Sequence, residues 1–420
     1  MLKMFKHYYF NKSKRFQYLS ASLVILVVAS MGTLLLIGSH AATPYASTTA
    51  DSGTLSGGAT KQTCTGASDG NCVVFGGTTT ASSIFPIGVY DQPTSLFATW
   101  KSRGVNTLVN VPDGDDETTW NAAAEQDGMY MIRQPAATPS SDENNPWLIA
   151  WLLGDEPELN GVSASSLITQ YQQLKSVDSK IPVMLNFAGG YVLGLNGSCD
   201  ESCYQAYGPA FDWGSNDIYP VTGYDQPNNL GLVGQAVTQL YQWFPGRPEF
   251  AFVETSDQLL PWIPNDPAPT PAEVGAEIWD EVIHGARGIT YFPLVCPNGD
   301  TESQPCTFSF DGTPADVVTE ITTQDALVES LAAPLLAPLN PSNQSVTVSS
   351  PLEASWRVTG STDYVIVLNL SSSTLTNATI QLTGFSGSQA TVYSENRTVP
   401  VNNNTITDTF APDQVHIYQF

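Results

Sequence analysis

Basic residues and histidines are scarce in this sequence, which has 420 residues, 15 Lys and Arg, 40 Asp and Glu, and 4 His. All 40 acidic residues but only ten of the basic ones follow Ala41, so this part carries a formal net charge of −30. Such an acidic surface repels nucleic acid and anionic lipid. The composition therefore argues against nucleic-acid binding and suits an extracellular protein with a neutral or cationic ligand.

The shortage of histidine also limits the chemistry. His7 and His40 lie in or beside the N-terminal segment, and His284 falls in a helical pattern that suggests a structural role. Histidine-based metal sites and Ser-His-Asp triads both need histidine beside other reactive groups. We therefore expect no metal ion and no organic cofactor.

The N-terminal segment predicts export. Five basic residues and no acid occupy the first 18 positions, and a nearly continuous apolar run extends from Leu19 to Ile37. Small residues before Ala42 fit signal cleavage, whereas an uncleaved run of this length would span a bilayer. Residues 1–41 are therefore a signal peptide or a membrane anchor, and in either case the rest of the chain lies outside the cytoplasm. We expect a monomer that touches the membrane only through this segment if it is uncleaved.

The cysteines predict disulfide bonds instead of a zinc site, because no pair has Cys-x-x-Cys spacing and no histidine stands near them. An even count behind an export signal indicates short-loop bridges. The three local pairs are Cys64 with Cys72, Cys199 with Cys203, and Cys296 with Cys306.

Residues 42–83 are rich in Thr, Ser, Gly and Ala and predict a linker with a small disulfide-clipped β element. The stretch from Ala50 to Gly76 resembles the opening strands of family 6 and family 35 carbohydrate-binding modules. The resemblance implies sugar binding, but only the start of such a module is present.

From Ile84 onward, short apolar runs alternate with helical patterns, which is typical of β/α units. We predict a (β/α)8 barrel over residues 84–335 and a small antiparallel β sandwich over residues 342–420, because the later segment alternates without helices. An open, doubly wound sheet is the alternative, but no Gly-rich loop follows the first strand. The predicted strands are 84–90, 105–111, 129–134, 148–154, 181–187, 215–219, 249–254 and 288–293.

Two of these strands end in acids. Asp155 and Glu156 follow the fourth strand, and Glu254 ends the seventh. The carboxyl ends of parallel barrel strands meet on one face, so these acids are expected to lie together. Glycosidic cleavage needs one protonated carboxyl for the leaving oxygen and one carboxylate for the oxocarbenium-like centre. The pattern therefore predicts a glycoside hydrolase.

On these motifs, residues 84–335 resemble the clan A (β/α)8 glycoside hydrolases, whose acid/base ends the fourth strand and whose nucleophile ends the seventh. The resemblance implies Glu156 as acid/base, Glu254 as nucleophile and a retaining mechanism. The segment Asn216–Pro220 resembles the sixth strand of such enzymes, which implies that Tyr219 orients the nucleophile. Asp155 stands where the clan usually has Asn, and its charge is expected to raise the pKa of Glu156.

Two other functions remain open. The Asp155–Glu156 pair also resembles the substrate-assisted N-acetylhexosaminidases, in which the substrate's 2-acetamido group attacks and Glu254 would not be the nucleophile. The third hypothesis is a non-catalytic surface protein that binds glycan or cell wall in the barrel cleft.

A sugar site also needs aromatic platforms and polar side chains that bind hydroxyl groups. Tyr219 and Trp262 are the strongest platform candidates, followed by Tyr90. Asn186 and Gln134 are candidates for hydroxyl contacts. Arg133 either binds the oligo- or polysaccharide substrate or pairs with an acid.

The cysteine spacing makes a direct prediction. Mass spectrometry of the non-reduced exported protein should find 64 bridged to 72, 199 to 203, and 296 to 306. Each short loop should stabilise the fold by at most about 3 kcal/mol, so reduction should loosen the loops before it unfolds the barrel. Free thiols or bound zinc would contradict the prediction.

Overall fold

The computed structural model describes residues 59–63, 71–75, 84–195, 197, 199–256, 267–296, 306–308 and 312–420. The chain divides into two compact units, residues 1–81 and 82–420. In the first unit, β1 (Ala59–Thr63) pairs antiparallel with β2 (Asn71–Phe75). The apolar run from Leu19 to Ile37, the bridge from Cys64 to Cys72, and Trp262 lie outside what the structure describes.

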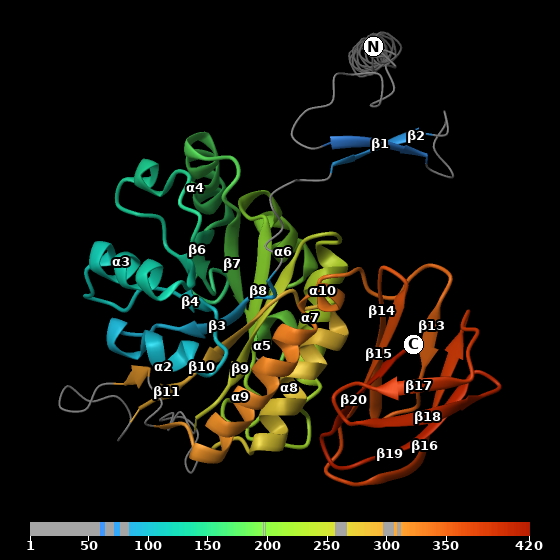
Figure 1. The fold of residues 1–420 in the computed structure, drawn as a ribbon. Helices are drawn as coiled ribbons and strands as arrows, with labels where there is room; N and C mark the ends of the chain where they lie inside the picture. The colour runs from blue at the N-terminus through green and yellow to red at the C-terminus, as the bar shows by residue number, and fades with distance from the viewer. Residues whose placement is uncertain are drawn as a thin grey trace, which may run out of the picture. The chain divides into compact units, whose positions relative to one another are not determined.

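Eight parallel strands of the second unit close into a barrel, in which β10 pairs with both β9 and β3 (Figure 1). This confirms the predicted fold and its eight strands. The strands are β3 (Ile87–Tyr90), β4 (Thr107–Val109), β5 (Tyr130–Arg133), β6 (Leu148–Asp155), β7 (Val183–Ala188), β8 (Trp213–Asp217), β9 (Glu249–Glu254) and β10 (Ile289–Phe292).

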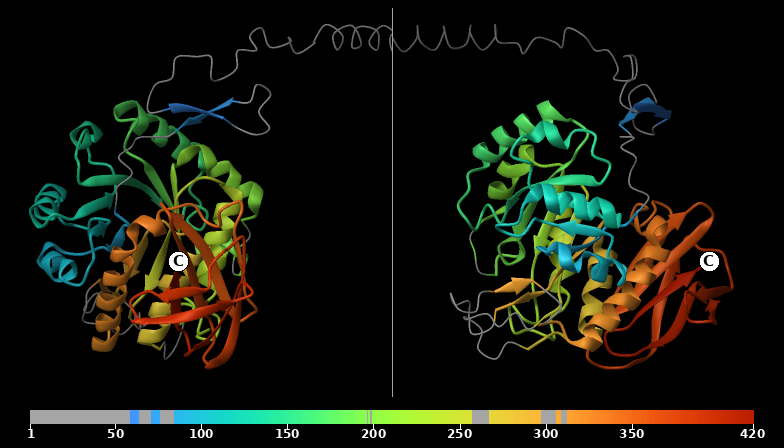
Figure 2. Two further views of the ribbon diagram at one scale, coloured as in Figure 1. Left: turned by 45° about the vertical axis from the view of Figure 1, so that its right-hand side comes forward. Right: turned by 60° about the vertical axis from the view of Figure 1, so that its left-hand side comes forward.

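Helices surround this barrel (Figure 2). Cap residues define their ends, for example the capping box of Thr270 and Glu273 that begins α8. Between β5 and β6, where every residue is described, only the short 3-10 helix η3 (Pro139–Asp142) occurs, in the interval where the sequence leaves no room for a full helix. The α-helices are α2 (Phe97–Lys101), α3 (Glu117–Asp127), α4 (Ala164–Val177), α5 (Gly189–Val192), α6 (Glu201–Tyr207), α7 (Leu232–Trp243), α8 (Pro271–His284), α9 (Ala315–Ser330) and α10 (Ala332–Leu335).

An antiparallel array of eight strands follows as the predicted sandwich, with strand order β13-β16-β19-β18-β17-β20-β15-β14. The sequence prediction did not identify strands β18 and β19, which are joined at the asparagine run of residues 402–404. The strands are β13 (Ser345–Thr347), β14 (Leu352–Thr359), β15 (Thr362–Asn369), β16 (Leu375–Thr383), β17 (Gln389–Val392), β18 (Arg397–Asn402), β19 (Thr405–Phe410) and β20 (Val415–Gln419).

The sandwich packs on the barrel through Arg357 of β14. This side chain is fully buried, and its guanidinium donates to the carbonyl oxygens of Leu335, Ala337 and Val282. A buried guanidinium needs such acceptors because its charge loses hydration. These contacts tie the sandwich to α8 and α10.

Two of the predicted disulfides, Cys199–Cys203 and Cys296–Cys306, are present. Disulfides persist in oxidising compartments, so the bridges are compatible with an extracellular location. None of the helices in the described part of the chain is both long and apolar enough to span a membrane.

Helix α8 buries three carboxyl groups, those of Glu277, Asp280 and Glu281. Burial raises the pKa of Asp280 to about 8, although its carboxylate accepts a hydrogen bond from the Gly234 amide over 2.9 Å. His284, on the same helix, contacts Thr238, and burial lowers its pKa to about 4, which fits the expected structural role. The three carboxyl groups therefore bind protons more tightly in the folded protein than in the unfolded chain, whereas His284 binds its proton less tightly.

These carboxyl groups predict an unusual pH dependence of stability. A raised carboxyl pKa gives stability that is complete below the unfolded pKa of about 4 and is lost as the pH rises through the folded value. For Asp280 the loss falls between about pH 4 and about pH 8. The free energy of unfolding, measured with urea, should therefore fall across this range.

Asp280→Asn, which keeps an acceptor for Gly234, should flatten the fall by up to about 1.4 kcal/mol per pH unit. Glu143→Gln, at an exposed position, is the matched control. The same slope in the wild type and in Asp280→Asn would contradict this origin of the pH dependence.

Candidate active site

A shift in strand register fixes the end of β6. Leu152 pairs with Met184 of β7, and both belong to the apolar cluster inside the barrel. Asn186 follows Met184 by two positions, so it faces the same side. The shift pairs Asn186 with Asp155 instead of Gly154. Asn186 then donates from Nδ2 to Oδ1 of Asp155 over 2.9 Å, so these two predicted site residues are neighbours.

Glu156 follows directly and turns the chain away from the barrel. Its φ of 43° lies in the left-handed region, and its amide still donates to the Asn186 carbonyl over 2.8 Å. Burial raises the pKa of the Glu156 carboxyl to about 7, and the charges of Asp155 and Glu158 add to the increase. A carboxyl group with this pKa keeps a large protonated fraction near neutral pH.

A further carboxyl, Asp217 at the end of β8, belongs to the same group. Burial raises its pKa well above the usual range, and repulsion from Glu156, Asp155 and Glu158 acts in the same direction. Asp217 was not among the predicted site residues, although it lies in the segment that resembles the clan's sixth strand. The rule that strand-end acids meet on one face would have identified it.

Asp155 differs from its neighbours because it stays exposed to solvent. The surrounding protein nevertheless raises the pKa of its carboxyl, since a group in a recess loses part of its hydration while it still touches water. The hydrogen bond from Asn186 opposes this increase. Among the acids of this group, Asp155 is therefore the best placed to remain ionised and to meet a ligand.

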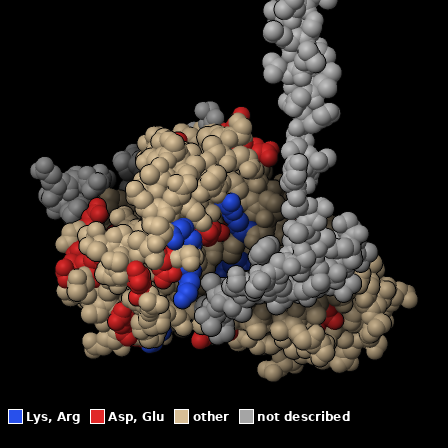
Figure 3. Space-filling view, turned by 90° about the horizontal axis from the view of Figure 1, so that it is seen from above, with Lys and Arg blue, Asp and Glu red and all other residues tan. Residues whose placement is uncertain are grey.

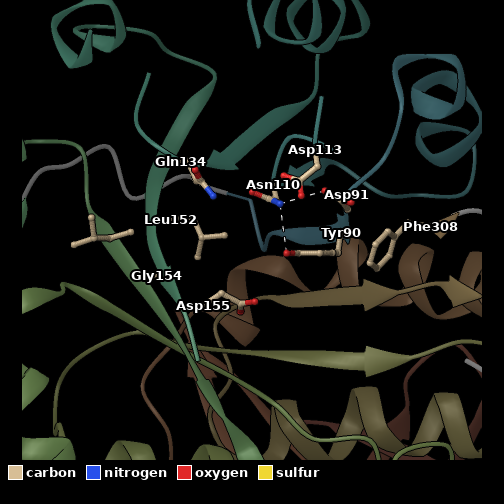
Figure 4. A pocket seen from close by; sticks show the side chains of 10 residues that line it. Tyr90, Asp91, Asn110, Asp113, Gln134, Leu152, Gly154, Asp155 and Phe308 are labelled. Atoms are coloured by element: carbon tan, nitrogen blue, oxygen red, sulfur yellow. Dashed lines mark hydrogen bonds between the residues drawn. The ribbon is translucent and has the colours of Figure 1, made fainter. Parts of the chain in front are cut away.

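A pocket of about 310 Å³ opens beside Asp155 (Figure 4). Asn110 lines the pocket and donates from Nδ2 to Asp91 Oδ1 over 3.1 Å and to the Tyr90 hydroxyl over 3.4 Å. Burial raises the pKa of Asp91 to about 6. Tyr90, Gln134 and Asp155 were predicted as site residues, whereas Asp91 and Asn110 were not, although they stand at the ends of the first two predicted strands. The lining residues are Tyr90, Asp91, Asn110, Asp113, Gln134, Leu152, Leu153, Gly154, Asp155 and Phe308.

Aromatic rings extend this pocket across the barrel mouth. Tyr90 lies 5.4 Å from Phe308 and 5.6 Å from Phe292 between ring centroids, and Tyr219 stacks on Phe292 at 5.0 Å. The Tyr219 hydroxyl is buried and has no hydrogen-bond partner among the described residues. The hydrogen bond to Glu254 that the resemblance implied is therefore not made.

Glu254 ends β9 as predicted, but its carboxyl is covered. The residue has 0% exposure, and its oxygens accept hydrogen bonds from the amides of Val221, at 2.7 Å, and Thr222, at 2.6 Å. Burial raises the pKa of Glu254, while these bonds and one from the Glu277 carboxyl lower it. Burial and the charge of Glu254 hold the pKa of Glu277 well above its usual range.

Basic side chains lie away from this site. Lys101, Lys175, Arg247 and Arg287 stand at the amino ends of strands, and Figure 3 shows Lys and Arg gathered around a hollow on one face of the molecule. Arg133 ends β5, but it is 1% exposed and pairs with Asp142 at 2.6 Å and with Glu117 at 3.3 Å. The structure thus favours the role of Arg133 as the partner of an acid over a role in substrate binding.

No group of three or more metal-ligating side chains is arranged to hold a metal ion within the described residues. The site accordingly consists of carboxyl, amide and aromatic groups from the strand ends. Such groups can transfer protons and hold hydroxyl groups.

Residues 162–305, less than half of the chain, match the family model of glycoside hydrolase family 42, described as β-galactosidase. The matched segment includes β7, β8 and β9, and so contains Asn186, Asp217 and Glu254. No curated protein matches the chain in sequence.

Several solved structures share the fold. An α-amylase from Geobacillus thermoleovorans in complex with acarbose has 12% identity and a TM-score of 0.51, with 78% of this chain and 90% of that chain covered. An Anoxybacillus α-amylase has 11% identity and a TM-score of 0.53, with 78% and 89% covered. A cyclomaltodextrinase has 8% identity and a TM-score of 0.53, with 80% and 78% covered.

Identities this low show the fold alone. With the family-model match, the barrel supports a clan A glycoside hydrolase whose family is unresolved.

The charge of Asp155 makes the next prediction. Asp155→Asn keeps an acceptor for Asn186 but removes the strongest charge acting on Glu156, so the pKa of Glu156 should fall. The basic limb of the pH profile of kcat/KM should move down by about one pH unit. A basic limb that stays in place or moves up would contradict the assignment of this limb to Glu156.

Proposed function

We propose that this protein is an exported retaining glycosidase in which Glu156 protonates the leaving oxygen and then, as a carboxylate, activates water. The observation that carries the proposal is the Glu156 carboxyl at the barrel's carboxyl end, with its pKa raised to about 7 by burial and by two neighbouring acids. A group that must first give and then take a proton works best with a pKa near the working pH.

The pocket supports a neutral or cationic glycan as the substrate. Asp91, Asp113 and Asp155 line it, and Arg133 is already paired with two acids. A polyanionic sugar chain would be repelled there. Tyr90 and Phe308 offer ring faces to a pyranose, while Asn110 and Gln134 can bind its hydroxyl groups.

The first candidate for the nucleophile is Glu254. The resemblance to clan A assigns it this role, and the family-model match includes it. Its carboxyl is covered by Val221 and Thr222, so direct attack on a sugar requires this segment to move. Double displacement would then proceed through a glycosyl–enzyme ester on Glu254.

The second candidate is the substrate's own 2-acetamido group, and the exposure of Asp155 beside Glu156 favours it. Asp155 would accept the acetamido N–H, the acetamido oxygen would attack the anomeric carbon, and Glu156 would protonate the departing oxygen. Asn186 holds the Asp155 carboxylate for this contact. Both candidates retain the anomeric configuration, and the present geometry favours the second because Glu254 is covered.

Glu156→Gln tests the shared part of the proposal. The change should slow hydrolysis of an unactivated glycan by about 10²- to 10⁴-fold, because it removes the proton donor. Substrates with activated leaving groups should lose least. Full activity of Glu156→Gln on the unactivated glycan would refute the catalytic assignment.

Two further variants identify the nucleophile. If Glu254 attacks, Glu254→Ala should nearly abolish turnover, and added azide should restore part of it as an inverted glycosyl azide. If the substrate attacks, Asp155→Ala should be the more damaging change, and only 2-acetamido sugars should be cleaved. Azide rescue of Glu254→Ala would contradict the substrate-assisted mechanism.

A further inference from the structure

The loop that carries the proposed proton donor is held from outside by one short helix. Glu158 Oε1 accepts hydrogen bonds from the Ala188 amide at 2.8 Å and from the Tyr204 hydroxyl at 3.0 Å. At the far end of the loop, the Tyr207 hydroxyl donates to the Val162 carbonyl at 2.7 Å. Tyr204 and Tyr207 both belong to α6, so this helix holds the loop of residues 156–162 by two hydrogen bonds.

The helix is itself fixed in place. The disulfide Cys199–Cys203 closes across its first turn. Tyr204 is fully buried, with its ring stacked on Trp243 of α7 at 4.7 Å and edge-on to Phe187 of β7 at 5.4 Å. These contacts restrict the position of the Tyr204 hydroxyl. Its hydrogen bond to Glu158 therefore fixes Glu158 relative to the barrel.

The loop has little packing of its own. Leu159 and Val162 are 44% and 37% exposed, so they contribute little burial. Within the loop, the Asn160 amide donates to the Glu156 carbonyl at 2.9 Å, and the Val162 amide donates to the Pro157 carbonyl at 2.8 Å. The left-handed backbone of Glu156 costs free energy and persists only where its surroundings hold it.

We propose that α6 is the positioning element of the Glu156 carboxyl, acting through the Tyr204–Glu158 and Tyr207–Val162 hydrogen bonds. The inference rests on the proposed function, because it assigns residues that act through Glu156. Misplacing a catalytic group by about 1 Å can cost about 10²-fold in rate. Loss of the Tyr204 and Tyr207 hydroxyls should therefore impair proton donation by Glu156 far more than it impairs substrate binding.

Glu158 has a second effect on the same carboxyl. Its charge adds to the repulsion that raises the pKa of Glu156, after burial and Asp155. Glu158→Gln keeps an oxygen that can accept from Tyr204 and Ala188 but removes the charge. The basic limb of the pH profile should then move to lower pH.

The test compares the double variant Tyr204→Phe/Tyr207→Phe with Tyr171→Phe. Tyr171 donates to Asp212 at 2.9 Å beside the amino end of β8, so its variant loses a similar bond away from the site. On an unactivated glycan, kcat of the double variant should fall by about 10-fold or more with little change in KM. On a dinitrophenyl glycoside, whose leaving group needs no proton, kcat/KM should stay within about twofold of wild type, because kcat/KM does not include the later step in which Glu156 activates water.

Thermal unfolding shows whether each variant is folded at the assay temperature. If the double variant matches Tyr171→Phe on both substrates, the positioning role is refuted. An equal loss of kcat/KM on both substrates would also refute it, because a general structural effect does not depend on the leaving group. If Glu156→Gln keeps full activity, the proposed function has failed; if only the double variant is normal, this inference alone has failed.

Discussion

The crowding of carboxyl groups at the ends of β6 and β8 is the constraint on which this structure depends. Asp155, Glu156, Glu158 and Asp217 share a region of low hydration, so ionisation of one raises the pKa of the others. The register shift in β6 places Asp155 beside Asn186, and α6 holds the loop beyond it. These features hold mutually repelling carboxyl groups close together. Because such repulsion destabilises the folded protein, the arrangement indicates a chemical role for this group of acids.

A second set of acids is buried on the other side of β9, and its role differs. Glu277, Asp280 and Glu281 of α8 are buried, and burial together with the charge of Glu254 raises the pKa of Glu277. Exposure separates the two sets: Asp155 meets solvent, whereas Glu254 is covered by the segment after β8. If Glu254 takes part in catalysis, this segment is the element that must move.

The sequence predicted the barrel well because eight apolar runs at regular spacing leave few other folds. It also located Asp155 and Glu156, since acids that end such runs must meet on one face. Two contacts could not be predicted: the cover over Glu254 comes from backbone amides, and the role of Glu158 depends on Tyr204, 46 residues away. Neither contact leaves a pattern in composition or periodicity.

The most direct measurement of the central claim is the pKa of the Glu156 carboxyl itself. In protein labelled with ¹³C at the glutamate side-chain carboxyl, the Glu156 resonance is the one that Glu156→Gln removes. The account predicts that it titrates at about 7, and that Asp155→Asn lowers this value. Titration at about 4, the value of an exposed glutamate, would contradict the account, because Glu156 would then be ionised at neutral pH.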